Sequence, residues 1–155
     1  RNDGEYPWPE AAEEVGLDFL DNGHGLAVFD YEQDGDLDIV VVVSEGEPLL
    51  LRSIMGGDYL RVRLADGAGI YEGSGAVVTM YQGGANPPQM QVIGAISHYL
   101  GQSERVAHFG LTADDGAIER VTIRWPRSGE ITELTNVERN QAITVIAPAA
   151  EAPER

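Results

Sequence analysis

Residues 59–64 read Tyr-Leu-Arg-Val-Arg-Leu, and this stretch decides the fold class. Leu60, Val62 and Leu64 fall on one side of an extended chain, and the two arginines between them fall on the other. Strict alternation of this kind predicts a β-strand with one buried face and one outward face. The stretch therefore indicates a sheet that covers an apolar core.

Short apolar or alternating runs recur after this strand, separated by turns rich in Gly, Pro, Asn and Asp. We expect an all-β fold, with a β-sandwich of jelly-roll-like form over residues 56–147. Its further strands are expected at residues 76–81, 89–93, 97–100, 106–111, 121–125, 130–134 and 142–147.

The N-terminal part predicts an appended β-hairpin over residues 26–55, with strands at 26–29 and 39–43 and a further short strand at 49–52. Residues 39–43 are apolar at every position, so both faces of that strand need cover, and we expect a second chain or another domain to supply part of it. An extended segment is expected over residues 1–25, with one helical turn near 10–15, and a tail over residues 148–155.

The turn of this hairpin carries the most specific chemistry of the chain. Carboxylates stand at every second position, and Gly35 stands where a sharp turn needs a glycine. Calcium takes roughly six to eight hard oxygen ligands in flexible geometry, and alternate inward carboxylates supply them. We expect Ca²⁺ to be bound by the side chains of Asp30, Glu32, Asp34 and Asp38 and by the carbonyl of Asp36, with a water completing the shell.

The alternative is a solvated acidic turn without a metal. Carboxylates this close repel one another strongly when no cation lies between them, which favours the metal. Magnesium fits less well because it demands stricter geometry and keeps its waters. The flanking strands argue against an EF-hand, as does Val41 at the twelfth position, where that motif needs a glutamate.

The net charge narrows the classes of partner. A formal charge of −16 repels phosphate backbones and anionic lipid surfaces, so we expect no nucleic-acid partner. The longest apolar run, residues 39–43, is too short to cross a bilayer, so we expect no membrane insertion. The chain has no cysteine and no lysine, which excludes disulfides and lysine chemistry and leaves bound metal as the local crosslink.

No catalytic constellation emerges from the residues, so we expect no enzyme. His24, His98 and His108 do not stand at metal-ligand spacing. His108 is expected to pack within its strand, and a ligand contact is the less favoured interpretation of His98. Trp125 shares the apolar parity of its strand, which favours packing in the core over stacking on a sugar.

Two resemblances add to this interpretation. Residues 29–39 resemble the calcium loop of an FG-GAP/VCBS-type repeat, although Glu32 stands where such repeats carry Asp or Asn. The second half is similar to the ASPIC/UnbV domain of the cartilage acidic protein family, which usually follows FG-GAP repeats. The matching motifs, in family order, are residues 59–62, 73–78, 97–103, 108–111, 121–126, 136–137 and 140–141. The resemblance implies an extracellular β module with no known catalytic residue.

Two classes of function follow. The first is a non-catalytic structural or adhesion module, secreted or at the cell surface, that binds calcium and self-associates by strand pairing into a homo-oligomer or filament. The second is a module of a larger secreted propeller protein that binds a glycan or another extracellular protein. An exposed aromatic platform with nearby amides or carboxylates would favour the second class.

Overall fold

The computed structural model describes residues 6–18, 22–69, 73–84, 86–95, 97–98 and 101–148. Every regular element in this part of the chain is a β-strand, so the predicted all-β class is confirmed. None of these residues forms a helix long and apolar enough to cross a bilayer. The strands are β1 (Gly23–Phe29), β2 (Asp38–Val43), β3 (Leu49–Leu51), β4 (Asp58–Ala65), β5 (Val77–Gln82), β6 (Gln89–Val92), β7 (Ser97–His98), β8 (Gly101–Gln102), β9 (Val106–Leu111), β10 (Ile118–Arg124), β11 (Ile131–Thr135) and β12 (Gln141–Ile146).

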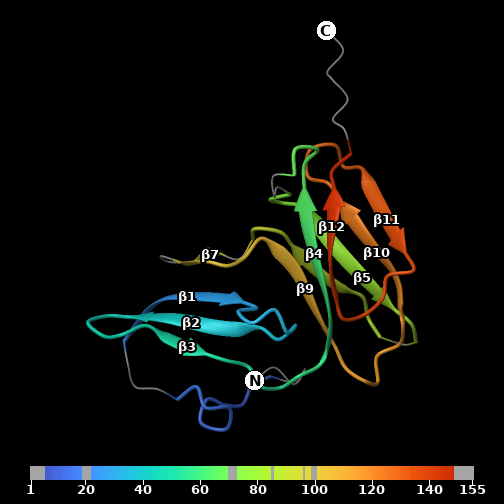
Figure 1. Cartoon of the computed structure of the whole chain (residues 1–155). Coiled ribbons are helices and arrows are strands. Elements are labelled where there is room, and N and C mark those ends of the chain that lie inside the picture. Colours follow the sequence, from blue (N-terminus) through green and yellow to red (C-terminus); the bar gives the residue numbers. More distant parts are fainter. Residues whose placement is uncertain are drawn as a thin grey trace.

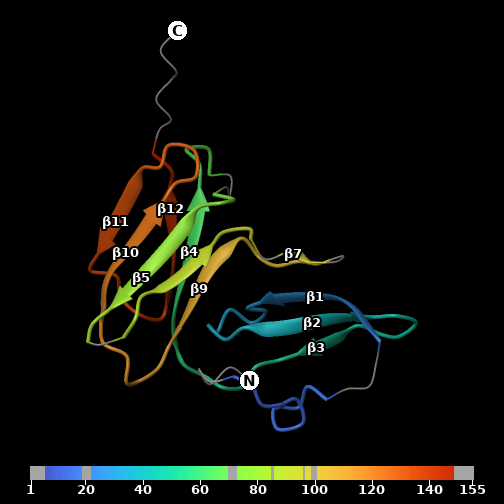
Figure 2. The same cartoon turned by 180° about the vertical axis from the view of Figure 1, so that it is seen from behind.

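Two sheets face one another across one core and form the sandwich (Figures 1 and 2). One has the strand order β11-β10-β5-β6 and the other the order β12-β4-β9. The alternation of residues 59–64 arises from this packing, because Leu60, Val62 and Leu64 are all 0% exposed in the core. That prediction is confirmed.

Strand β4 is the central strand of its sheet and joins distant parts of the chain. It pairs antiparallel with β9 and parallel with β12. The parallel pair runs from Gln141 opposite Leu60 to Ile146 opposite Ala65. Because both edges of β4 are paired, its outward face is a fixed surface on which another element is able to dock.

Glutamine side chains close the seam where β6 meets β9. Gln91 Nε2 donates to the His108 carbonyl, and Gln91 Oε1 accepts the His108 amide at 3.1 Å. Gln89 Nε2 donates to the Gly110 carbonyl at 3.1 Å. These amides occupy backbone groups of an edge strand that would otherwise be free to pair with another chain.

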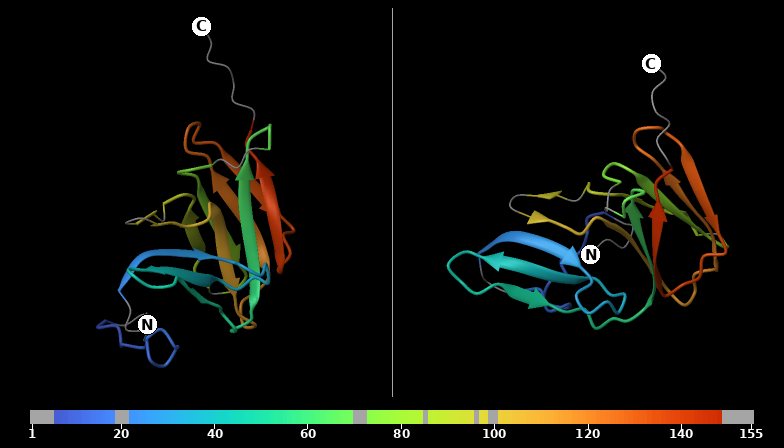
Figure 3. Two further views of the ribbon diagram at one scale, coloured as in Figure 1. Left: turned by 60° about the vertical axis from the view of Figure 1, so that its left-hand side comes forward. Right: turned by 45° about the horizontal axis from the view of Figure 1, so that its top comes forward.

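The N-terminal strands form a separate sheet, in the order β1-β2-β3, which lies beside the sandwich (Figures 1 and 3). The expected strands are present, and β1 begins earlier than expected, at Gly23. The helical turn expected near residues 10–15 is also present, with the Val15 amide donating to the Ala11 carbonyl at 3.1 Å.

Strand β2 is apolar almost throughout, and its two faces are covered unequally. Val41 and Val43 are buried, whereas Val42 is 53% exposed. Leu50 on β3 lies on the same face as Val42 and is 43% exposed. Part of this face is therefore open to solvent, and the cover expected from a second chain or domain stays a prediction.

Candidate functional site

The acidic turn, residues 30–38, joins β1 to β2 and packs against the outward face of β4 (Figures 1 and 3). Gly35 makes the contact: it is buried, and a Cβ built on it would lie 2.0 Å from Tyr59 Cδ1. Its φ of +99° also favours glycine. The glycine expected for a sharp turn thus has a second role, because it lets the backbone approach the tyrosine ring.

Asp30 organises the turn from its first position. Its Oδ1 accepts the Asp34 amide and its Oδ2 accepts the Gly35 amide, both at 3.1 Å. Oδ2 also accepts Arg61 Nη1 at 3.0 Å, in an ion pair whose two side chains are 5% exposed or less. A carboxylate has about four lone-pair positions, so these contacts leave Asp30 capacity for one more ligand.

Asp38 ties the end of the turn to the segment that follows β3. Its Oδ2 accepts the Tyr31 amide at 2.8 Å, and its Oδ1 accepts the Ser53 amide at 2.9 Å. Burial opposes ionisation, but these two hydrogen bonds, with Glu32 and Arg52, outweigh burial and lower the pKa of Asp38. Asp38 is therefore a buried carboxylate that is charged at neutral pH.

Glu32 is the acid of the turn whose oxygens remain unsatisfied. Both carboxylate oxygens are buried and have no hydrogen-bond partner among the described residues. Arg52 Nε forms an ion pair with Oε1, without the geometry of a hydrogen bond. The carboxylate also meets that of Asp38. Two acidic groups in contact form a position that a cation stabilises, and the Arg52 guanidinium supplies one positive charge there.

Asp34 and Asp36 hold backbone groups of the turn and of the segment that follows β3. Asp34 is exposed, and its Oδ1 accepts the Asp36 amide at 3.0 Å. Asp36 Oδ2 accepts the Gly56 amide at 2.8 Å, although the sequence interpretation gave Asp36 only a carbonyl role. In the described part of the chain, no three acidic or histidine side chains converge around one point. Glu32 and Asp38 are the pair that the turn brings together.

Arg61 is a residue of the candidate site that sequence reasoning did not identify. It is 4% exposed because the acidic turn covers it. Its Nη1 contacts Asp30, and its Nη2 lies 2.7 Å from Glu104 Oε2. Arg63, on the same face of β4, lies 3.2 Å from Glu104 Oε1 with its side chain 31% exposed. The alternation placed both arginines on the outward face, but no local signal indicated which one would be covered.

His108 lies opposite Arg61 on β9 and packs as expected. Its ring stacks on Tyr59, with centroids 6.3 Å apart and planes 8° apart. Burial and the nearby charge of Arg61 lower the pKa of His108, against the opposing effect of the acidic groups around it. His24 is exposed, and the side chain of His98 lies outside the described residues.

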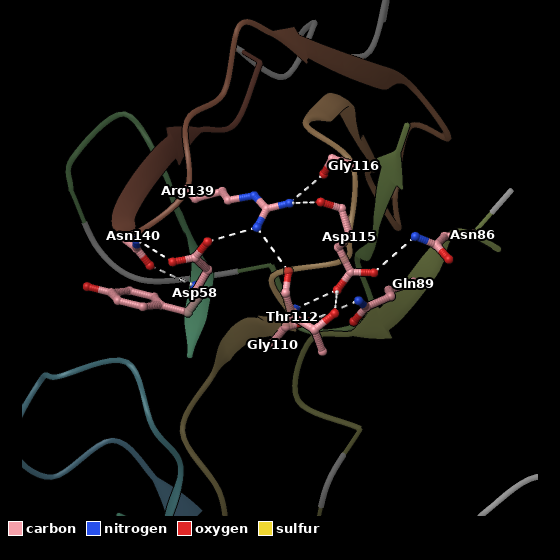
Figure 4. A network of polar contacts seen from close by, with 10 residues as sticks. Asp58, Asn86, Gln89, Gly110, Thr112, Asp115, Gly116, Arg139 and Asn140 are labelled. Atoms are coloured by element: carbon pink, nitrogen blue, oxygen red, sulfur yellow. Dashed lines mark hydrogen bonds and ion pairs between the residues drawn. The ribbon is translucent and has the colours of Figure 1, made fainter. Parts of the chain in front are cut away.

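A second polar network connects the loops at the end of the sandwich where β4 begins (Figure 4). Arg139 donates from Nη1 to Asp58 Oδ2 at 2.8 Å and from Nη2 to the Gly116 carbonyl at 2.7 Å. Asn140 Nδ2 donates to Asp58 Oδ1 at 2.7 Å. The hydrogen bonds from Arg139 and Asn140 lower the pKa of Asp58. Because these bonds hold the Asp58 carboxylate, the network stabilises the loops that it connects.

The aromatic residues bear on the ligand-binding alternative. Trp125 is 6% exposed and its Nε1 donates to Thr132 Oγ1 at 2.9 Å, so its predicted place in the core is confirmed. Trp8 is 61% exposed and Tyr6 is 88% exposed. A shallow cavity of about 350 Å³ lies beside β6, and none of the described residues that line it is aromatic. Binding of a glycan or a protein ligand stays a prediction.

Comparison with known proteins gives three matches. The family model described as ASPIC and UnbV matches residues 68–152. Cartilage acidic protein 1 of Mus musculus and cartilage acidic protein 1 of Homo sapiens are each 31% identical over 137 residues. Each alignment covers 83% of this chain, which is more than residues 68–155 contain, so the similarity extends into the N-terminal part. The chain spans 20% of the length of each relative.

Proposed function

Because the chain belongs to the ASPIC and UnbV family, we propose that it is a non-catalytic, calcium-binding structural module of an extracellular protein. In this proposal the sheet β1-β2-β3 with its acidic turn is a single FG-GAP-type repeat placed before the family domain. The relatives are named for cartilage, which supports an extracellular location, and for acidity, which this chain shares with its net charge of −16.

The observation that carries the calcium proposal is the state of Glu32. Its two oxygens are buried and lack a hydrogen-bond partner among the described residues, and its carboxylate contacts the Arg52 guanidinium and the buried carboxyl group of Asp38. Leaving an acidic oxygen buried without a donor is costly, and a hard cation removes that cost. The carboxylate oxygens of Glu32 and Asp38 therefore fit calcium, which prefers carboxylate and carbonyl oxygen as ligands.

Within the turn, we assign the ion to Glu32 and Asp38, the two acidic side chains that the structure brings together. Asp34 is exposed and its Oδ1 accepts the Asp36 amide, and the Asp36 carbonyl is the backbone ligand of the proposal. The bound ion would supply positive charge between carboxylates that repel one another in its absence. Its effect is to fix the turn, and through Gly35 the position of the sheet on the sandwich.

Self-association is the second part of the proposal. Val42 and Leu50 leave an apolar face partly open, and β3 is an edge strand of its sheet in the described part of the chain. An exposed edge with apolar side chains favours pairing with another strand. We propose a second copy of the chain as the partner, in a homo-oligomer or a filament.

Thermal unfolding in calcium and in EDTA tests the calcium proposal. Calcium at a hundred times its Kd adds about 2.7 kcal/mol to the free energy of unfolding, which raises Tm by about 5–10 °C for a chain of this size. Glu32→Gln should remove most of this rise. Asp114→Asn removes one exposed carboxylate of the β9–β10 loop and is the matched control, which should keep the rise.

Equal Tm values in calcium and in EDTA would contradict calcium binding. Self-association is checked separately by sedimentation velocity over a range of protein concentration. A single monomer boundary at high concentration with calcium would contradict the assembly part and leave the calcium part standing.

A further inference from the structure

We propose that Arg61 is a resident cation of the acidic turn, which holds the turn on the sandwich when no calcium is bound and weakens the affinity of the turn for calcium. This inference rests on the proposed function, since it concerns the same turn. It assigns a role to a residue outside the run of acids, and it predicts how the module behaves at low calcium.

The contacts place the charge of Arg61 inside the turn. Arg61 is 4% exposed, and its Nη1 lies 3.0 Å from Asp30 Oδ2. Asp30 is the carboxylate that accepts the Asp34 and Gly35 amides, so the guanidinium stabilises the residue that gives the turn its shape. A buried charge–charge hydrogen bond of this kind is stronger than one between neutral groups.

The same pair joins two parts of the molecule. Asp30 and Arg61 are 31 positions apart in the sequence, and Arg61 stands on β4 two residues after Tyr59, which Gly35 contacts. Breaking one side of a buried ion pair leaves the other charge without compensation. Without Arg61, Asp30 would therefore be a buried, uncompensated carboxylate until the turn left the sheet or bound another cation.

Calcium and Arg61 both place positive charge in the acidic turn, so each weakens the binding of the other. The guanidinium of Arg61 neutralises Asp30 and repels a divalent ion bound by Glu32 and Asp38 in the same turn. Glu104, 2.7 Å from Nη2, compensates part of the arginine charge and so limits this competition. Arg61 thus lowers the affinity of the turn for calcium, and it keeps the turn docked on the sandwich when no metal is bound.

Arg63 provides a matched control. It has the same side chain and lies on the same face of β4, and it also contacts Glu104, at 3.2 Å. Its side chain is 31% exposed, so solvent screens its charge. The buried ion pair with Asp30 belongs to Arg61.

The test compares Arg61→Gln with Arg63→Gln by hydrogen–deuterium exchange in EDTA and by calorimetric titration with calcium chloride. In EDTA, the amides of residues 31–36 should exchange faster in Arg61→Gln than in the wild type, and Arg63→Gln should match the wild type. The calcium Kd of Arg61→Gln should fall by about tenfold, with protection restored by the ion. Glu104→Gln, which frees the charge of Arg61, should raise the calcium Kd, and this variant serves if Arg61→Gln does not fold.

Equal exchange in EDTA and equal calcium Kd for Arg61→Gln and Arg63→Gln would overturn the inference. If Arg61→Gln fails to fold, an unchanged calcium Kd in Glu104→Gln overturns it. A wild type that binds no calcium refutes the proposed function and the competition together, and exchange in EDTA then decides the docking role of Arg61.

Discussion

Replacing Gly35 with alanine tests whether the acidic turn docks through a backbone contact. The new Cβ would lie 2.0 Å from Tyr59 Cδ1 and 2.3 Å from Cε1. Real Cβ atoms do not approach carbon this closely, so the ring or the turn must shift. The φ of +99° adds a second cost, because L-residues disfavour that region of the backbone.

The two costs give the expected magnitude. Alanine at a positive φ loses about 1–2 kcal/mol relative to glycine. Forcing an extra group into a packed site costs about 1–3 kcal/mol. Gly35→Ala should therefore lower the free energy of unfolding by about 2–5 kcal/mol, which is a large part of the stability of an ordinary domain.

Urea unfolding followed by tryptophan fluorescence measures this loss. Gly84→Ala is the control, because Gly84 has a φ of +87° and nothing within 4 Å of its Cβ position. Gly84→Ala should be destabilised by the backbone cost alone. Adding Tyr59→Ala to Gly35→Ala should restore much of the stability that the ring contact removes. Equal losses for Gly35→Ala and Gly84→Ala would refute the argument, because they would show that the ring contact costs nothing.

Two further predictions concern the core and the ring beside the turn. Thr132→Val should cost about 1 kcal/mol of unfolding free energy, because it removes the acceptor of Trp125 Nε1, and Thr135→Val on the exposed part of the same strand should cost less in the same urea assay. The pKa of His108 is lowered in the fold, so its contribution to stability is complete above the unfolded pKa of about 6.5 and is lost as the pH falls from that value through the lowered one. Urea midpoints between pH 5 and 8 should therefore fall toward acid, and His108→Gln should flatten that slope; an unchanged slope in the variant would assign it to other groups.

Local patterns predicted most of the strands and the place of the acidic turn, but not the short strand β8. The alternation of Leu60, Val62 and Leu64 indicated a buried face because a strand repeats every two residues, and all three side chains lie in the core. Gly35 was recognisable as a turn residue from its place in the middle of the acidic run, which is also a local feature. The turn itself was readable because its acids follow one another in the chain.

Contacts between distant residues were not readable in this way. Arg61 and Asp30 meet across 31 positions, so no spacing within either segment indicates their ion pair. The seam made by Gln91 and His108 joins strands of different sheets, and the sequence of β6 carries no sign of it. Burial of a charged side chain depends on which element covers it, and that depends on the whole topology.

The position of β4 also sets an order of events as the chain leaves the ribosome. β4 ends at Ala65, whereas the partners on its two edges begin at Val106 and Gln141. The acidic turn is therefore synthesised long before its platform is complete, and for that interval the apolar strand β2 and the apolar face of β4 are open to chaperones and to aggregation. Docking of the turn on the finished sheet is then a late step in the maturation of the nascent chain.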